Sequence, residues 1–240
     1  MSLIRKYGKT FEKNFPNTKL DRRSITDVPV EEIPDCDGMI GGPPCQSWSE
    51  AGAGRGVNDK RGQLFFDYIR IIKTKQPKFF LVENVSGIIS SRHRKSFDSF
   101  LEQFERCGYE ISWKLVNAND YNVPEDRERV IIVGIRKDLD KKFIFPEPHE
   151  HKPNLREAIG DLPEALPAQE KNKTNGELEI TNHEYMVGGF SPIYMSRNRV
   201  RTWEQPSFTI QAGGRQAPIH PKAPLMIKIG KDKQIGRAHV

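Results

Sequence analysis

The sequence predicts an α/β fold built on a parallel sheet, followed by a smaller region of short strands and irregular chain. Three observations support this fold class. Apolar runs alternate with amphipathic stretches between residues 36 and 136, which is the rhythm of βαβ units. Five prolines then interrupt the chain after Lys142, at positions 146, 148, 153, 163 and 167. The 240 residues suffice for one full domain and a small appended one.

The first elements follow from apolar spacing. Met39 and Ile40 end a strand that enters a Gly/Pro turn. Residues 62–75 predict an amphipathic helix, which Pro77 ends, and residues 78–82 predict a buried strand. The apolar face of that helix consists of Leu64, Phe65, Tyr68, Ile69 and Ile72.

A second helix is predicted over residues 93–107, with Gly108 at its end. Its apolar face consists of Phe97, Phe100, Leu101 and Phe104. Strands follow at 109–116 and 129–136. We place a domain boundary near residues 145–155, which divides the chain into parts 1–148, 149–233 and a non-native tail at 234–240.

Composition excludes several classes of protein. Mean hydropathy is −0.66 and no apolar run approaches the roughly 18 residues of a membrane span, so we expect no membrane partner. The first residues lack the apolar stretch of a signal peptide. Three cysteines at unhelpful spacings fit neither a disulfide framework nor a metal site. We therefore expect a cytoplasmic protein without a bound metal.

The positive charge is concentrated at one end of the chain. Net charge is +6, and residues 197–240 hold nine Lys/Arg against two Asp/Glu. A basic segment on a neutral body favours contact with a polyanion such as nucleic acid. An ordinary solvated charged surface explains the same count.

Two candidate reactive groups follow apolar runs. Cys45 comes after Gly41-Gly42-Pro43-Pro44, and Glu83 ends the run that begins at Phe79. Strand ends at the carboxyl edge of an open α/β sheet are where ligands bind. A single cysteine is more often an inert small apolar residue, but a rigid Gly/Pro loop is a poor place for a core thiol.

Arg127 and Arg129 complete a set of groups that suits a heteroaromatic ring. A thiolate can add to an electron-poor ring carbon, a carboxyl group can bond a ring nitrogen, and an arginine can bind a carbonyl oxygen. Each member has a plainer explanation as well. Glu83 could cap a turn, and the arginines could pair with nearby acids. These acids are Glu125, Asp126 and Glu128.

These segments resemble the motifs of the cytosine-C5 DNA methyltransferase family. The catalytic loop matches Gly42-Pro43-Pro44-Cys45-Gln46, and the Glu-Asn-Val strand end matches residues 83–85. The Gln-x-Arg-x-Arg element aligns with residues 125–129, with Glu in place of Gln. Residues 61–65 and 117–121 resemble two further blocks. Residues 195–201 and 211–216 are similar to the target-recognition region of bacterial members that modify GGCC sites in restriction–modification systems.

The resemblance implies a mechanism and a substrate, which is a cytosine flipped out of double-stranded DNA. Cys45 would attack C6, Glu83 would hold N3 and the exocyclic amine, and Arg129, with Arg127 beside it, would bind O2. S-adenosylmethionine would supply the methyl group. Further assigned residues are Gln46 and Ser49 in the catalytic loop, Pro44 and Leu64 at the cofactor, and Arg197, Arg199 and Arg215 on guanines.

The sequence departs from the family pattern at both ends. It lacks the Phe-x-Gly-x-Gly cofactor turn and the closing Asn-containing cofactor loop, and Ser24 stands where an acidic adenine contact is expected. We therefore expect a methyltransferase (Rossmann-like) sheet without its first strand, and weak or no activity of this chain alone. A second chain could supply the missing cofactor segment. The alternatives are a non-catalytic DNA-binding remnant, an RNA cytosine-5 methyltransferase and, least favoured, a cysteine hydrolase.

Overall fold

The computed structural model describes residues 2–43, 64–169, 178–180, 183–185, 200–210, 220–223, 226–230 and 233–236. The chain divides into two compact units. Unit 1 comprises Met1–Trp113 with Ile131–Ile144, and unit 2 comprises Lys114–Val130 with Phe145–Val240. The finer division at residues 148 and 233 stays a prediction.

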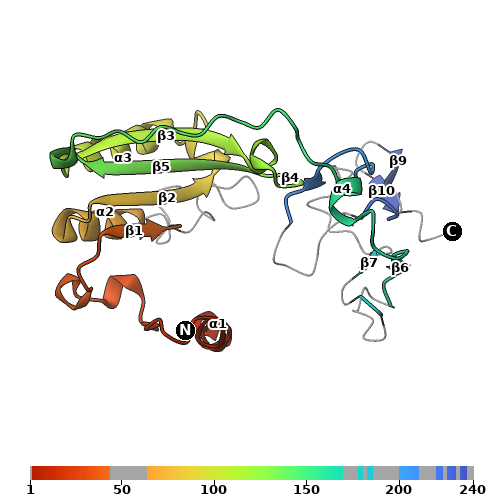
Figure 1. Cartoon of the computed structure of the whole chain (residues 1–240), viewed down its shortest axis with the longest axis horizontal. Helices are drawn as coiled ribbons and strands as arrows, with labels where there is room; N and C mark the ends of the chain where they lie inside the picture. Colours follow the sequence, from red (N-terminus) through yellow and green to blue (C-terminus); the bar gives the residue numbers. More distant parts are fainter. Residues whose placement is uncertain are drawn as a thin grey trace. The chain divides into compact units, whose positions relative to one another are not determined.

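A four-stranded sheet organises the first part of the chain (Figure 1). Its strands are β1 (Gly38–Gly41), β2 (Phe79–Val85), β3 (Tyr109–Asn117) and β5 (Glu128–Arg136), in the order β1-β2-β5-β3. Strands β1 and β2 are parallel, with Gly38 opposite Phe79 and Gly41 opposite Val82. The α/β class is thus confirmed.

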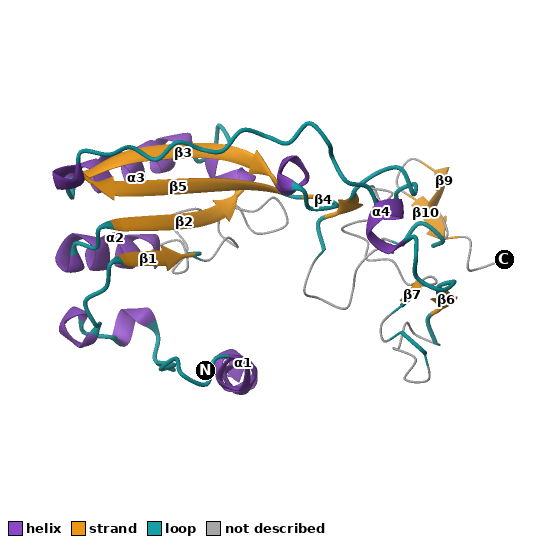
Figure 2. Cartoon of the chain, viewed as in Figure 1, coloured by secondary structure: helices purple, strands orange, loops and turns teal. Residues whose placement is uncertain are grey.

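The sheet is mixed and not parallel throughout, because β5 runs against both of its neighbours (Figure 2). The amide of Arg136 donates to the carbonyl of Lys78 and that of Lys137 to the carbonyl of Gly108, each over 2.9 Å. The end of β5 therefore lies beside the starts of β2 and β3. The reason is the short link from β3 to β5, since a parallel crossover needs about a dozen residues or more.

Two helices and the inward faces of the strands form the core of unit 1. Helix α2 spans Leu64–Lys75 and α3 spans Arg94–Arg106, close to the predicted bounds. Cys107 caps α3, and Gly108 follows with φ +95°, a left-handed conformation that suits glycine. Strand β2 extends three residues beyond the predicted end at 82, so Glu83 lies within the strand.

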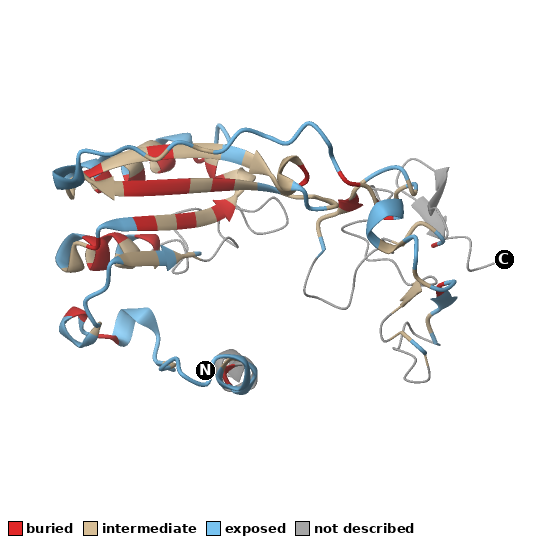
Figure 3. Cartoon of the chain, viewed as in Figure 1, coloured by how far each residue is buried: buried red, intermediate tan, exposed pale blue. Residues whose placement is uncertain are grey.

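Five aromatic rings meet at the centre of this core, and all are fully buried. Phe65 of α2 stacks on Phe100 of α3 with ring centroids 4.0 Å apart. Phe80 of β2 lies 4.4 Å from Phe104 and 5.0 Å from Tyr109. The predicted helix faces supply most of these rings, which explains why burial concentrates between the helices and the sheet (Figure 3). Leu101 and Tyr68, also predicted on these faces, are only half-buried.

The remaining elements are short, apart from helix α1 (Ser2–Asn14). The 3₁₀ helices span Ile25–Asp27, Val30–Glu32, Ser86–Ile89, Ala118–Tyr121 and Lys137–Leu139. Unit 2 contains α4 (Leu155–Ile159) and the strands β4 (Glu125–Asp126), β6 (Leu166–Pro167), β7 (Glu184–Tyr185), β8 (Ser207–Phe208), β9 (Met226–Gly230) and β10 (Lys233–Gly236). Strand β4 pairs with β8 and β6 with β7, both parallel, and β9 pairs with β10 antiparallel. No helix in the described ranges has the length and apolar character needed to cross a bilayer.

Candidate active site

The carboxyl ends of β1 and β2 place Glu83 beside the start of the Gly/Pro loop. In the parallel register, Gly41 lies opposite Val82, so Gly42 follows at the level of Glu83. A Cβ built on Gly42 would lie 3.5 Å from Oε2 of Glu83. The carboxylate therefore lies against the backbone three positions before Cys45. Parallel strands bring this about because their ends meet at one edge of the sheet.

Asn84 links the same loop to β2, a role that its position in the 83–85 match did not indicate. Its side chain is 1% exposed. The Nδ2 group donates to the carbonyl of Pro43 over 3.2 Å, and Oδ1 accepts from the amide of Val85 over 3.0 Å. Alternate burial along β2 was the available signal, because Asn84 falls on the same inward face as Phe80 and Val82.

Tyr68 of α2 holds β1 and β2 together just before their ends. Its hydroxyl lies 3.1 Å from the carbonyl oxygen of Met39 and 3.2 Å from that of Leu81, to which it donates. Burial raises the pKa of this hydroxyl, which therefore stays protonated as a donor. The ring packs so closely that a Cβ on Gly41 would lie 2.4 Å from it. Glycine is thus required where the strand meets this tyrosine.

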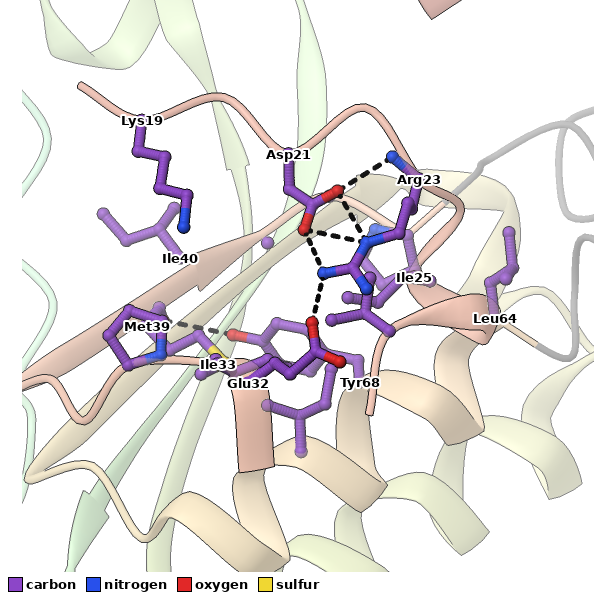
Figure 4. Close-up of a pocket in the computed structure, with 16 residues that line it drawn as sticks. Lys19, Asp21, Arg23, Ile25, Glu32, Ile33, Met39, Ile40, Leu64 and Tyr68 are labelled. Carbon is purple, nitrogen blue, oxygen red and sulfur yellow. Dashed lines mark hydrogen bonds and ion pairs between the residues drawn. The ribbon is translucent and has the colours of Figure 1, made fainter. Parts of the chain in front are cut away.

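A cavity of about 570 Å³ opens beside β1 within unit 1 (Figure 4). Its apolar wall includes Ile25, Met39, Ile40, Leu64 and Tyr68. Leu64, a predicted cofactor neighbour, thus lines it, as does Pro43, the residue before Pro44.

A charged cluster borders this cavity. The Nη2 atom of Arg23 lies 2.7 Å from Oδ2 of Asp21 and 2.7 Å from Oε2 of Glu32 (Figure 4). Hydrogen bonds from Arg23 lower the pKa of Asp21 to about 2. The carboxylate of Asp21 is therefore ionised at neutral pH, and its guanidinium partner is already in place.

The two candidate arginines lie in unit 2, Arg127 between β4 and β5 and Arg129 within β5. The amide of Arg127 donates to Oδ1 of Asn117 over 3.0 Å, and its Nη1 lies 3.5 Å from Oε1 of Glu125. The Nη1 of Arg129 donates to the carbonyl of Glu128 over 2.7 Å. Arg127 therefore forms an ion pair with a neighbouring acid, which is the plainer explanation given for it from the sequence. Glu83 belongs to unit 1 and Arg129 to unit 2, so the joint arrangement of Cys45, Glu83 and Arg129 stays a prediction.

Several predicted residues lie outside the described part of the chain. They are the catalytic-loop and cofactor candidates Pro44, Cys45, Gln46 and Ser49, and the DNA-reading candidates Arg197, Arg199 and Arg215. Among the residues that are described, no group of three or more His, Cys, Asp or Glu side chains could hold a metal ion.

Comparison with known proteins identifies relatives along the whole chain. The family model for C-5 cytosine-specific DNA methylase matches residues 2–239. The chain is 56% identical to the Type II methyltransferase M.MthTI of Methanothermobacter thermautotrophicus, an alignment that covers 95% of this chain and 69% of that protein. It is 54% identical to M.FnuDI of Fusobacterium nucleatum, covering 93% and 66%. It is 51% identical to M.NgoPII of Neisseria gonorrhoeae, covering 92% and 66%.

The chain therefore spans about two thirds of the length of these three relatives. Among solved structures, a DNA modification methyltransferase encoded within an E. coli prophage matches with a TM-score of 0.58 and 21% identity, covering 89% of this chain and 74% of that one. A DNMT2 mutant of Spodoptera frugiperda matches with a TM-score of 0.51 and 24% identity, covering 63% and 48%. At these identities the two structures indicate a shared fold.

Proposed function

Since the chain belongs to the C-5 cytosine-specific DNA methylase family, we propose that it recognises a duplex DNA site and attacks C6 of a flipped cytosine. The reaction would serve a restriction–modification system, as the relatives' description as Type II methyltransferases suggests. The observation that carries the proposal is the position of the Glu83 carboxylate, whose Oε2 lies 3.5 Å from where a Cβ on Gly42 would stand, three positions before Cys45.

The proposed chemistry assigns one task to each group. The Cys45 thiolate forms a bond to C6, which moves an electron pair toward C5 while Glu83 bonds N3 and the exocyclic amine. Arg129, supported by Arg127, binds O2. S-adenosylmethionine supplies the methyl group that C5 takes up. Loss of the C5 proton then expels Cys45, so that the aromatic ring is restored. Gln46 and Ser49 complete the loop around the opened stack.

The residues of unit 1 fit part of that cofactor. The apolar wall that includes Ile25 and Leu64 suits a flat ring such as adenine, and a volume of about 570 Å³ is in the range of ligand pockets. We propose that Leu64 and Pro44 line the site. The acids Asp21 and Glu32 are already held by Arg23, which supports weak binding and weak activity of this chain alone.

A second chain would complete the cofactor site. Strand β1 is an edge strand of the sheet that the described residues form. Ile40 on this strand is 76% exposed, an unusual position for a large apolar side chain. Both observations support a partner segment beside β1. We place the protein with its DNA in the cytoplasm of a bacterial or phage-infected cell.

We further propose that the DNA site is GGCC. Arg197, Arg199 and Arg215 would each bond O6 and N7 of a guanine, which discriminates by about 1–3 kcal/mol against other bases. The nine Lys and Arg residues between positions 197 and 240 give this region the charge that DNA binding requires.

A covalent trap tests the proposal. The full chain is incubated with S-adenosylmethionine and a GGCC duplex that carries 5-fluorocytosine at the target position. Fluorine cannot leave C5 as a proton does, so the enzyme stays bonded to the DNA. Because the chain alone is weakly active, we expect the adduct to accumulate slowly; Cys45→Ser should abolish it and Glu83→Gln should slow it about 100-fold further.

The alternative functions give other outcomes. DNA binding without an adduct, together with no heat of S-adenosylmethionine binding in calorimetry, would indicate a non-catalytic remnant. Stronger competition by transfer RNA than by duplex DNA would indicate an RNA substrate.

A further inference from the structure

Two adjacent acids in unit 2, Glu125 and Asp126, connect two segments that are far apart in the sequence. They form β4, which pairs in parallel with β8, so that Glu125 lies opposite Ser207 and Asp126 opposite Phe208. The amide of Ser207 also donates to the carbonyl of Pro124 over 2.9 Å. The turn that leads into Arg127 is thus fastened to residues 200–210.

Asp126 is the centre of this connection. Its Oδ2 lies 3.0 Å from Nη2 of Arg201, and its Oδ1 accepts from Nδ2 of Asn117 over 2.7 Å. The guanidinium carbon of Arg201 lies 3.9 Å from the ring centroid of Phe208, a close cation–π distance. The Arg201 side chain is only 21% exposed. Arg201 is therefore held inside the unit, between a carboxylate and a ring.

Glu125 makes the second half of the connection. Its Oε1 accepts from the amide of Ile210 over 2.8 Å and lies 3.5 Å from Nη1 of Arg127. The hydroxyl of Thr209 donates to the backbone carbonyl of Asp126 over 2.9 Å. One carboxylate thus contacts both the 200–210 segment and an arginine proposed to act on the target base. These contacts also give a structural reason for Glu at position 125, where the resemblance expects Gln.

We propose that Arg201 is a positioning residue, which acts through Asp126 to hold residues 200–210 in register with β4, the strand directly before Arg127 and Arg129. Arg201 follows two positions after Arg199, a proposed guanine reader. The arrangement couples recognition of the DNA site to binding of the target base. The coupling to DNA rests on the proposed function, whereas the register itself is a property of the free protein. In this proposal the guanidinium of Arg201 pairs with Asp126 and does not contact a DNA phosphate.

The test compares Arg201→Gln with a matched control, Arg156→Gln. Arg156 belongs to the same unit, pairs with Glu204, and lies 5.7 Å from the ring of Trp203. Its side chain is 61% exposed, so the pair is a surface contact of little weight. Asp126→Asn, the double variant, and the swapped pair Asp126→Arg with Arg201→Asp complete the set.

Two readouts are measured on the full chain. The first is peptide-level hydrogen exchange of residues 117–129 in the free protein. We expect Arg201→Gln and Asp126→Asn each to accelerate this exchange about tenfold. The variant that carries both substitutions should exchange no faster than either one, and the control should exchange like the unmodified chain. The second is binding to a GGCC duplex and to a duplex with one guanine replaced, over a range of salt concentrations. We expect the affinity ratio of the two duplexes to fall about tenfold while the salt slope is unchanged, and the swapped pair to restore part of the ratio.

Other results would overturn the inference. An equal loss of affinity for both duplexes, with a salt slope smaller by about one, would make Arg201 a phosphate contact. If hydrogen exchange over residues 117–129 is unchanged in Arg201→Gln, Arg201 does not hold the register. If the unmodified chain does not discriminate between the duplexes, the proposed function fails, and the exchange measurement alone decides whether Arg201 holds the register.

Discussion

Replacing Asn84 by alanine removes the side chain that joins the Gly/Pro loop to β2. Two hydrogen bonds are lost, the one to the Pro43 carbonyl and the one from the Val85 amide. The site is buried, with Asn84 1% exposed, so water does not readily replace either bond. An unpaired buried polar group costs about 1–3 kcal/mol, and we expect the variant to lose about 2–4 kcal/mol of unfolding free energy.

Urea unfolding measures this loss. A slope of about 2 kcal/mol per molar converts the expected change into a fall of about 1–2 M in the midpoint. Far-ultraviolet circular dichroism reports mainly on unit 1, since α1, α2 and α3 have 13, 12 and 13 residues, whereas α4 of unit 2 has five.

Asn14→Ala is the control for this measurement. The Nδ2 of Asn14 also donates to a backbone carbonyl, that of Thr10 over 2.7 Å, but on an exposed surface. We expect that variant to change stability by less than about 0.5 kcal/mol. A midpoint for Asn84→Ala that matches the Asn14→Ala midpoint would refute the view that this amide secures the loop.

Two further predictions concern stability. Burial lowers the pKa of His220 to about 4, below the ordinary 6.5, so the unfolded chain binds the proton first and unit 2 should lose stability as the pH falls from 6.5 towards 4. The half-exposed ring reduces the effect to about 1–2 kcal/mol. Urea midpoints followed by tryptophan fluorescence, to which Trp203 beside His220 contributes, should show this loss, and His220→Gln should abolish it. Tyr109→Phe removes a buried bond of 2.7 Å to the Pro77 carbonyl and should lower the free energy of unfolding by about 1–2 kcal/mol. The control Tyr121→Phe, where the hydroxyl bond is exposed, should change it by less than about 0.5 kcal/mol, and equal urea midpoints for the two variants would contradict this.

The helices could be predicted because their signals are local. Phe65, Ile69 and Ile72 recur at helical spacing, and all three are buried in α2. Gly108 ends α3 in the left-handed conformation expected of a helix-terminal glycine. In both cases a few neighbouring residues determine the outcome.

The direction of β5 and the partner of Arg201 depend on distant parts of the chain. Arg201 lies 75 positions from Asp126, and nothing in the spacing of either residue indicates the other. In the sequence Arg201 stands in the 195–201 block that resembles a target-recognition region, where it is interpreted as positive charge available to DNA. The position of Glu83 relative to the Gly/Pro loop was easier to predict from the sequence. The carboxyl ends of parallel strands meet at one edge of the sheet, whatever side chains lie between them.

The paired glycines at the start of the Gly/Pro loop differ in what they tolerate. A Cβ added at Gly41 would lie 2.4 Å from the ring of Tyr68, so any larger residue there must displace either that ring or strand β1. Among the described residues, the atom nearest to a Cβ added at Gly42 is Oε2 of Glu83 at 3.5 Å, an ordinary contact distance. Substitution at position 42 could therefore be used to adjust the surroundings of that carboxylate. Alanine or serine there would alter its hydration and leave the sheet undisturbed.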